Sequence, residues 1–185
     1  MALYTRKGDD GTTTTFACDQ RMSKSSKIAE ALGTMDEANS YLGLCKVQAV
    51  ADNFTLGDTK LSDIVHEMQD DCFIVQAELA GDTSKTIPEE KVKWLEEITD
   101  KIETELPKIT TFFISGGSEL AARFDFARTL IRRAERRAVE VHEEGVQELG
   151  KHTLAYLNRM SSALYALARF ANHQRDIKED APDYK

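Results

Sequence analysis

Proline is scarce in this chain of 185 residues, and its scarcity constrains the fold more than any other feature. Only Pro88, Pro107 and Pro182 occur, so residues 1–87 and 108–181 run without the residue that breaks helices. Apolar residues recur at helical spacing in five segments, which we predict to be helices. These segments are residues 25–51, 61–80, the stretch between the first two prolines, 118–144 and 149–172. The short connections between them are typical of antiparallel neighbours in a helical bundle.

The length is that of a single domain covering residues 1–185. We divide it into an N-terminal arm (1–24), a helical bundle (25–175) and a tail (176–185). Hydrophobic residues make up 41% of the sequence, enough for a core, but they form no apolar run that could span a membrane. The sequence also opens without a secretion signal.

Charge and cysteine usage narrow the function further. The net charge of −8 argues against nucleic acid as a partner, because duplex binding depends on neutralising phosphates. Cys18, Cys45 and Cys72 are odd in number and include no Cys-x-x-Cys pair, so we expect free thiols in a reducing compartment. We therefore predict a cytoplasmic protein whose partners are neither nucleic acids nor membranes.

A cluster of arginines stands out in this acidic chain. Six occur within fifteen residues: Arg123, Arg128, Arg132, Arg133, Arg136 and Arg137. In a helix, Arg128, Arg132 and Glu135 share one face. Guanidinium groups suit phosphate and carboxylate oxygens, so this face predicts a small anionic ligand. The alternative is a solvated helix with internal salt bridges to Asp125, Glu135 and Glu140.

The N-terminal arm contains a second candidate site. Residues 5–15 combine two cations, Gly8, Gly11 and four consecutive threonines. Glycine turns present backbone N–H groups and threonines add hydroxyl donors, so this loop could hold phosphates, although it lacks a Walker A sequence. The alternative is a plain hairpin turn at residues 8–11, followed by a short strand over residues 12–16.

Further polar side chains fall on helix faces that we expect to be buried. Asp36 and Asn39 lie three residues apart, as do Asn158 and Ser161, with Tyr165 on the same face as the latter pair. Buried polar groups pair or bind something, so these either form a structural network, such as Asp36 with Arg128, or line a site. The segment 110–117 is apolar and then glycine-rich. It is either ordinary packing or the wall of a site for a large flat ligand.

Taken in order, these segments resemble the PduO-type ATP:cob(I)alamin adenosyltransferases. The resemblance covers nearly the whole chain and rests on residues 4–11 (YTRKGDDG), 33–37 (GTMDE), 112–117 (FFISGG), 127–129 (ART) with 132–136 (RRAER), and 156–161 (YLNRMS). It implies an all-α fold, a five-helix bundle with a short irregular phosphate-binding arm. It also implies a homotrimer whose active sites lie between subunits. The implied reaction transfers the 5′-deoxyadenosyl group of ATP to the cobalt of cob(I)alamin, giving adenosylcobalamin and triphosphate.

The resemblance implies a role for each part of the site. The phosphates of ATP would contact the arm at Thr5, Arg6, Lys7, Gly8, Thr13, Thr14 and Lys24. The nucleotide site would be completed by Arg132, Arg133, Ala134, Glu135, Arg136 and Asn158. The nucleophile is the cobalt itself, so the protein needs no activated Ser, Cys or His and instead positions two substrates and stabilises the leaving group.

The catalytic residues implied by the resemblance are Arg132, Arg128, Asp36 and Phe112. Arg128 would pair with a partly buried Asp36 at the subunit boundary. Phe112 would bind the corrinoid by pressing on the lower face of the corrin, where it disfavours an axial ligand. Mg²⁺ would arrive on the triphosphate without dedicated protein ligands, so no metal site is expected in the chain. A corrin reductase and an adenosylcobalamin-dependent enzyme, to which the product is delivered, would be the protein partners.

The sequence departs from the family pattern at three positions. Ser115 replaces a common proline, which predicts a less rigid Phe112 loop, Ser162 replaces a usual aspartate, and Lys27 replaces a frequent arginine. Two other classes of protein remain as alternatives. A ferritin-like metal bundle is disfavoured because no histidine has a glutamate three residues before it. A non-catalytic sensor or carrier of ATP or corrinoid would need the same site as the enzyme.

Overall fold

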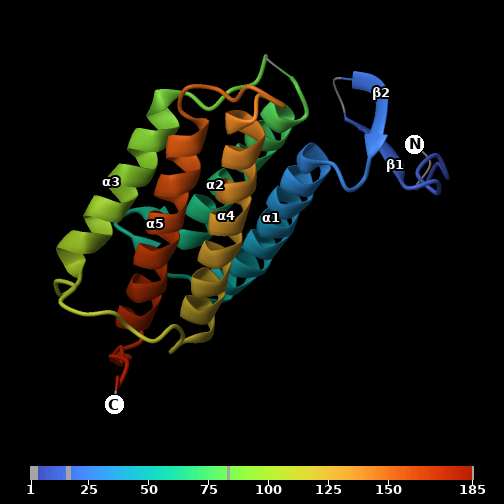
Figure 1. Ribbon diagram of the computed structural model, residues 1–185. Coiled ribbons are helices and arrows are strands. Elements are labelled where there is room, and N and C mark those ends of the chain that lie inside the picture. The colour runs from blue at the N-terminus through green and yellow to red at the C-terminus, as the bar shows by residue number, and fades with distance from the viewer. Residues whose placement is uncertain (1–3, 16–17, 83, 185) are drawn as a thin grey trace.

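A computed structural model describes residues 4–15, 18–82 and 84–184 of the chain (Figure 1). The predicted bundle is confirmed, and its helices are α1 (Lys27–Asp52), α2 (Leu61–Leu79), α3 (Glu89–Glu105), α4 (Glu119–Glu143) and α5 (Thr153–His173). Helix α4 packs between α1 and α5, while α2 lies against α1 and α3 lies against α5. The arginine-rich helix is therefore central, and the faces that it does not bury are open to a ligand.

Side-chain caps and prolines set several helix ends where the sequence places them. Ser26 caps α1 by accepting from the Ala29 N–H at 3.3 Å, and Ser118 caps α4 by accepting from the Ala121 N–H at 3.2 Å. Helix α5 begins at Thr153, four residues later than predicted. The reason is Glu78, which is buried and accepts from the Gly150 N–H at 3.0 Å and the Thr153 hydroxyl at 2.6 Å. These bonds hold residues 149–152 outside the helix.

Two small hairpins complete the fold. Strand β1 (Thr12–Thr15) pairs antiparallel with β2 (Cys18–Ser23), and β3 (Thr55–Leu56) pairs with β4 (Thr59–Lys60). The strand predicted over residues 12–16 corresponds to β1, although residue 16 lies outside the described residues. The glycine-rich segment 8–11 precedes β1, so it is not the turn of this hairpin. The arm that the hairpin forms projects beyond the start of α1 and away from the other helices (Figure 1).

The core is apolar, with a small number of paired polar groups. The buried Tyr156 donates its hydroxyl hydrogen to Asp71 at 2.7 Å, and Lys91 pairs with the same carboxylate at 2.9 Å. Burial raises the pKa of the Cys45 and Cys72 thiols to about 12, so both are unreactive at neutral pH. The side chain of Cys18 lies outside the described part of the chain. None of the helices found in the described ranges is long and apolar enough to cross a membrane.

Candidate active site

The arginines of α4 divide into two groups according to their partners. The first group forms ion pairs with glutamates of α1 and α4. These pairs are Arg123 with Glu119 (2.6 Å), Arg133 with Glu37, and Arg137 with Glu140 (3.0 Å) and Glu30 (3.6 Å). Such exposed pairs neutralise charge without adding much stability. Half of the cluster is therefore the solvated charged helix that the sequence offered as an alternative.

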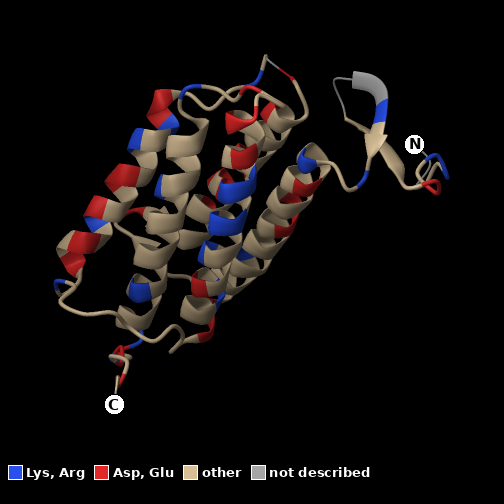
Figure 2. Ribbon diagram, in the orientation of Figure 1, with Lys and Arg blue, Asp and Glu red and all other residues tan. Residues whose placement is uncertain are grey.

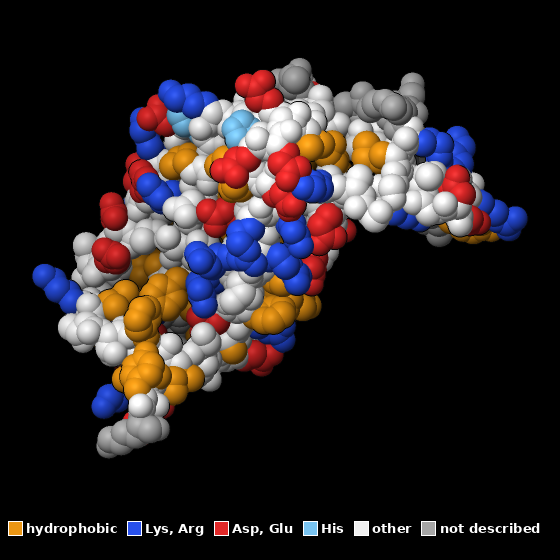
Figure 3. Space-filling view, in the orientation of Figure 1, with side chains coloured by type: hydrophobic (Ala, Val, Ile, Leu, Met, Phe, Trp, Pro, Cys, Tyr) orange, Lys and Arg blue, Asp and Glu red, His pale blue; other side chains and the backbone are white. Residues whose placement is uncertain are grey.

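The second group is Arg128, Arg132 and Arg136, one turn apart along a single stripe. None of the three has a carboxylate within 4.0 Å among the residues that the structure describes. Arg136 donates to the backbone carbonyl of Arg132 at 3.0 Å, and the Arg128 guanidinium lies 5.9 Å above the ring of Tyr165. Lys and Arg positions follow one another along the α4 ribbon (Figure 2), and a band of cationic side chains is visible at this place in the space-filling view (Figure 3). Like charges in a row repel, so the stripe favours an anion.

The internal partners proposed for this stripe are engaged elsewhere. Asp125 accepts from the Gly116 N–H at 2.9 Å, and Glu135 accepts from the side chain of Asn158 at 3.0 Å. Burial raises the pKa of Asp125, while the Gly116 N–H and the charge of Arg128 act in the opposite direction. Neither carboxylate forms an ion pair with the stripe within the described residues.

A cavity of about 590 Å³ opens where the arginine stripe meets the loop between α3 and α4. Arg128 and Arg132 supply charge on one side, and the α5 residues Ser161 and Tyr165 lie beside them. The other side is apolar and is formed by Leu106, Ile109, Phe112, Phe113 and Ile102. Hydrophobic side chains gather next to the cationic band on this face (Figure 3). The cavity can therefore hold a ligand that is flat and apolar at one end and anionic at the other.

Phe112 belongs to the apolar wall but is 76% exposed. A large ring in water is costly to leave uncovered, so its position suits stacking against a second flat surface. Residues 111–113 and 115 of the segment 110–117 line the cavity, and the binding of a flat ligand there stays a prediction. The prediction for the polar residues of α5 was right for Ser161, which is buried, but wrong for Asn158, which is exposed.

The end of the Phe112 loop is fixed by side chains of α4 and α5. Asn172 donates to the Gly116 carbonyl at 2.8 Å and accepts from the Ser118 N–H at 2.8 Å. At Gly117, φ is +100°, and a Cβ there would lie 2.5 Å from the Asn172 side chain, so only glycine fits. Together with the bond to Asp125, these contacts hold the loop without the proline that Ser115 replaces. Sequence reasoning did not identify Asn172.

Two other predicted site residues occupy positions that the sequence did not anticipate. Asp36 is exposed on α1 and forms no ion pair with Arg128 within the described residues of the chain, so its predicted partial burial is wrong for the single chain. Pairing across a subunit boundary stays a prediction. Ala134 is buried in the core between the arginines. Asn39 is buried as predicted, with its side-chain oxygen unpartnered.

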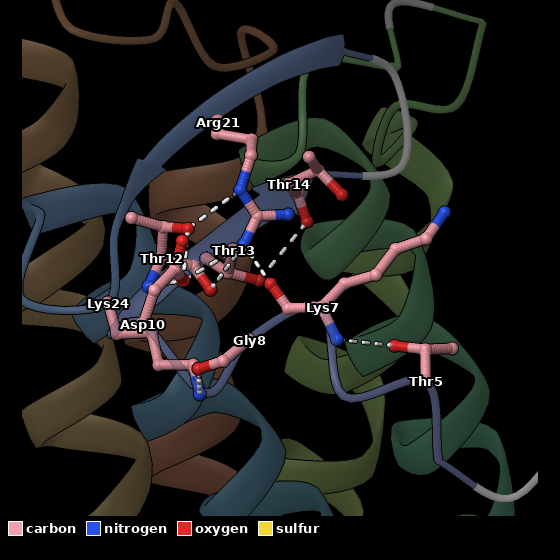
Figure 4. A network of polar contacts seen from close by, with 9 residues as sticks. All are labelled: Thr5, Lys7, Gly8, Asp10, Thr12, Thr13, Thr14, Arg21 and Lys24. Atoms are coloured by element: carbon pink, nitrogen blue, oxygen red, sulfur yellow. Dashed lines mark hydrogen bonds and ion pairs between the residues drawn. The ribbon is translucent and has the colours of Figure 1, made fainter.

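The N-terminal arm forms a compact loop of its own (Figure 4). Lys24 donates to the Gly8 carbonyl at 2.8 Å, and the Lys7 N–H lies 3.4 Å from the Thr5 hydroxyl. A Cβ at Gly8 would lie 3.0 Å from the Lys24 amine, so a larger residue there would require the Lys24 side chain to shift. An ammonium group has three donors, so Lys24 keeps donors for a phosphate while it closes the loop.

Arg21 organises this loop, and sequence reasoning missed it. Its guanidinium donates to the Thr12 hydroxyl at 2.7 Å, to Asp10 at 3.2 Å, and to the carbonyls of Lys7 and Thr12. No local pattern in β2 (CDQRMS) distinguishes Arg21 as a residue that holds the loop. The hydrogen bonds of residues 4–24 that the structure describes stay within the arm or reach only the adjacent Ser25 and Ser26. The arm and the cavity therefore do not meet within one chain.

The described residues contain no group of three or more His, Cys, Asp or Glu side chains placed to hold a metal ion. The fold and site together define a class: a five-helix bundle that combines a cationic stripe, an apolar cavity and a separate loop rich in phosphate-type donors. Comparison with known proteins gives the class a family. Residues 3–171 match the family described as cobalamin adenosyltransferase, and the chain belongs to it.

Individual relatives agree with this assignment. The corrinoid adenosyltransferase PduO of Salmonella typhimurium is 38% identical over 96% of this chain and 52% of its own length. The corrinoid adenosyltransferase of Mycobacterium tuberculosis (strain H37Rv) is 35% identical over 95% of this chain and 91% of its own. The chain thus spans about half the length of the PduO relatives.

A solved structure extends the match to three dimensions. A variant PduO-type ATP:corrinoid adenosyltransferase from Lactobacillus reuteri, complexed with cobalamin and ATP, superposes with a TM-score of 0.86. It is 28% identical and covers 99% of this chain and 97% of its own. The resemblance inferred from the motifs is confirmed, and so is the bundle fold.

Proposed function

We propose that this protein transfers the 5′-deoxyadenosyl group of ATP to the cobalt of cob(I)alamin. The electron pair of Co(I) forms a bond to the 5′-carbon. The bond between the 5′-carbon and the phosphate oxygen breaks, and triphosphate leaves with the electron pair of that broken bond. The products are adenosylcobalamin and triphosphate. Family membership supports this reaction, as does the Lactobacillus reuteri relative solved with both cobalamin and ATP.

One observation carries the proposal: the unpaired arginines and the exposed Phe112 line the same cavity. The reaction needs a flat apolar surface for the corrin next to positive charge for the leaving triphosphate. We assign Phe112 to the lower face of the corrin, where it excludes an axial ligand. We assign Arg132 to the phosphates, and Arg136, Glu135 and Asn158 to the rest of the nucleotide.

The other half of the ATP site is assigned to the arm of a neighbouring subunit. Thr5, Arg6, Lys7, Gly8, Thr13, Thr14 and Lys24 would bind the phosphates there. The arm projects away from the helical bundle (Figure 1), and none of its described residues lines the cavity of its own chain, which supports this arrangement. So do Leu44, Val47 and Val50 on α1 and Phe126 on α4, which are exposed although apolar and suit a subunit interface. We propose a homotrimer with Asp36 and Arg128 paired at this interface.

The proposed reaction also assigns roles to Arg133, Ala134, Mg²⁺ and two protein partners. Arg133 pairs with Glu37 and Ala134 is buried, so their assigned part is to hold the stripe in place beside the nucleotide. Mg²⁺ is assigned to the triphosphate, since the described residues offer no carboxylate cluster for it. A corrin reductase would supply Co(I), and an enzyme that uses adenosylcobalamin would receive the product.

The test is anaerobic incubation of the purified protein with chemically reduced cobalamin, ATP and Mg²⁺, followed by absorbance. We expect the cob(I)alamin band to decay while a light-sensitive product and triphosphate appear in equal amounts. Omission of ATP is the control. ATP binding without turnover would instead indicate a sensor or carrier of nucleotide or corrinoid, and binding of neither would overturn the assignment.

A further inference from the structure

Arg169 of α5 connects three parts of the molecule outside the residues assigned above. Its side chain is 7% exposed, and its Nε donates to the Glu179 carboxylate at 2.9 Å. A second nitrogen donates to the Pro107 carbonyl at 3.1 Å, and the guanidinium lies 5.2 Å above the ring of Phe113. One side chain thus joins α5, the C-terminal tail and the loop that carries Phe112.

The tail contacts this loop a second time. After α5 the chain folds back, and the Asp180 carbonyl accepts from the Ile114 N–H at 2.8 Å. Ile114 lies two residues from Phe112, and Glu179 lies one residue from Asp180. The tail is therefore attached to the loop by a backbone bond and to the helix by an ion pair. Loss of the ion pair would release the backbone bond beside it.

The low exposure of Arg169 makes its ion pair with Glu179 important for holding the arginine side chain in place. A guanidinium with so little exposure loses far more when its carboxylate is removed than an exposed arginine does. Arg169 also lines the 590 Å³ cavity together with Phe112 and Phe113. A shift of Arg169 therefore moves the apolar wall, whereas the arm residues assigned to the phosphates lie elsewhere (Figure 1).

We propose that Arg169 and Glu179 are positioning residues that set the affinity for the corrinoid. They hold the Phe112 loop against α5 through the tail, so the wall is formed before the corrin arrives. This inference rests on the proposed function, since it names the substrate whose binding the pair controls. It assigns the ion pair to the corrinoid and not to ATP.

The chain contains a matched control for this pair. Arg175 forms an ion pair with Asp52 at 2.6 Å and lies 5.6 Å above the ring of Phe54. The Asp52 side chain is 4% exposed. This second arginine, carboxylate and phenylalanine hold the end of α5 against α1, and none of them lines the cavity. Glu179→Gln and Asp52→Asn therefore each remove a carboxylate that pairs with an arginine, one beside the proposed corrinoid wall and one remote from it, although Arg175 is 46% exposed and Arg169 only 7%.

The experiment compares these two variants with the wild-type protein in the adenosylation assay. We expect Glu179→Gln to raise the KM for cob(I)alamin by about tenfold and to leave the KM for ATP within about twofold, because one charge-assisted contact is lost. Asp52→Asn should change neither KM, although it lowers the melting temperature. Equal rises in both KM values, or no rise in the corrinoid KM, would overturn the proposal.

Hydrogen exchange of the Ile114 amide gives a readout that does not depend on turnover. We expect exchange at this amide to become faster in Glu179→Gln and to stay unchanged in Asp52→Asn. If the wild-type protein fails to adenosylate cobalamin, the proposed function is wrong, and this measurement still decides whether the pair holds the loop. Unchanged exchange in Glu179→Gln would refute the positioning role itself.

A second variant, Arg169→Lys, tests the same proposal if Glu179→Gln does not fold. Lysine keeps the charge beside Glu179 but lacks the planar fork that reaches Pro107 and covers Phe113. We expect a corrinoid KM between those of the wild-type protein and Glu179→Gln, with the ATP KM unchanged. A corrinoid KM equal to that of the wild-type protein would show that the fork has no part in positioning the wall.

Discussion

The arginine stripe of α4 and the N-terminal arm are both cationic, but they are held in different ways. The stripe lies on a helix whose opposite face is buried through Ala127, Ile131 and Ala134. The arm is held by hydrogen bonds among exposed residues, many of them made by Arg21. Core packing fixes the stripe before any ligand binds, whereas exposed polar contacts contribute little stability each. For the proposed site, this difference predicts one preformed half and one half whose order depends on its ligand and on a neighbouring subunit.

Loss of an arginine from the preformed stripe should lower the activity more than the other substitutions do. We expect Arg132→Ala to lower kcat/KM by about tenfold to a hundredfold or more, since charge-assisted bonds to phosphate contribute roughly 1.5–3 kcal/mol. The variant should keep its fold, because Arg132 is exposed. Arg137→Ala is the control on the same helix, since Arg137 pairs with Glu140 and Glu30. Steady-state kinetics that gave near-normal activity for Arg132→Ala would make the stripe structural.

Arg128→Ala should affect assembly as well as turnover. This arginine lies over Tyr165 and has no partner carboxylate within the described residues of its own chain. If it pairs with Asp36 of a neighbour, its loss leaves that carboxylate facing an interface without a counter-charge. Sedimentation should then show dissociation of the trimer at concentrations where Arg132→Ala stays assembled. A fully trimeric Arg128→Ala variant would exclude the pairing.

The arm should respond to loss of its organising residue. We expect Arg21→Ala to raise the KM for ATP by about tenfold, because several loop acceptors lose their common donor. The melting temperature should not change, since the contacts lie outside the core. Lys93→Ala, which removes an exposed ion pair with Glu89 on α3, is the control. An unchanged ATP KM would mean that the arm needs no internal order to bind phosphates.

Substitution of Asp10 should have the smallest effect on the KM for ATP, and the pKa of Asp10 determines how that effect varies with pH. Hydrogen bonds from the Thr12 hydroxyl and N–H, with the charge of Arg21, lower the pKa of Asp10 below 3.8. A carboxylate whose pKa is lowered on folding contributes above its free value and loses that contribution only as the pH falls through the lowered pKa. Asp10→Asn should therefore raise the ATP KM by a few-fold equally from about pH 5 to about pH 8. A difference that disappeared within this range would contradict the assigned charge state.

Sequence patterns predicted the bundle better than the site. Helical spacing and the positions of Pro88 and Pro107 located the helices, because apolar periodicity and helix breaking act locally. The start of α5 was missed because Glu78, far away in the chain, fixes the turn before it. The hairpin of β3 and β4 was missed because its two-residue strands carry too little periodicity, although Gly57 was a turn signal.

At the site, several residues of the motifs line the cavity, but the sequence did not show which charges are paired. Arg133 and Arg132 are adjacent in the sequence, yet only Arg133 reaches Glu37 on another helix. Such pairing depends on how α1 packs against α4, which no local pattern encodes. For the same reason, Asn172 and Arg169 were not recognised as the residues that hold the Phe112 loop.

The projecting arm has a consequence for mixtures of defective chains. If each site takes its arm from one subunit and its stripe from another, a chain with an inactive arm and a chain with an inactive stripe can complement each other. In randomly mixed trimers of the two, a site has a sound arm with probability one half and a sound stripe with the same probability. About a quarter of the sites would then be complete. Two proteins that are each inactive would give an active mixture, as intragenic complementation does in a diploid cross.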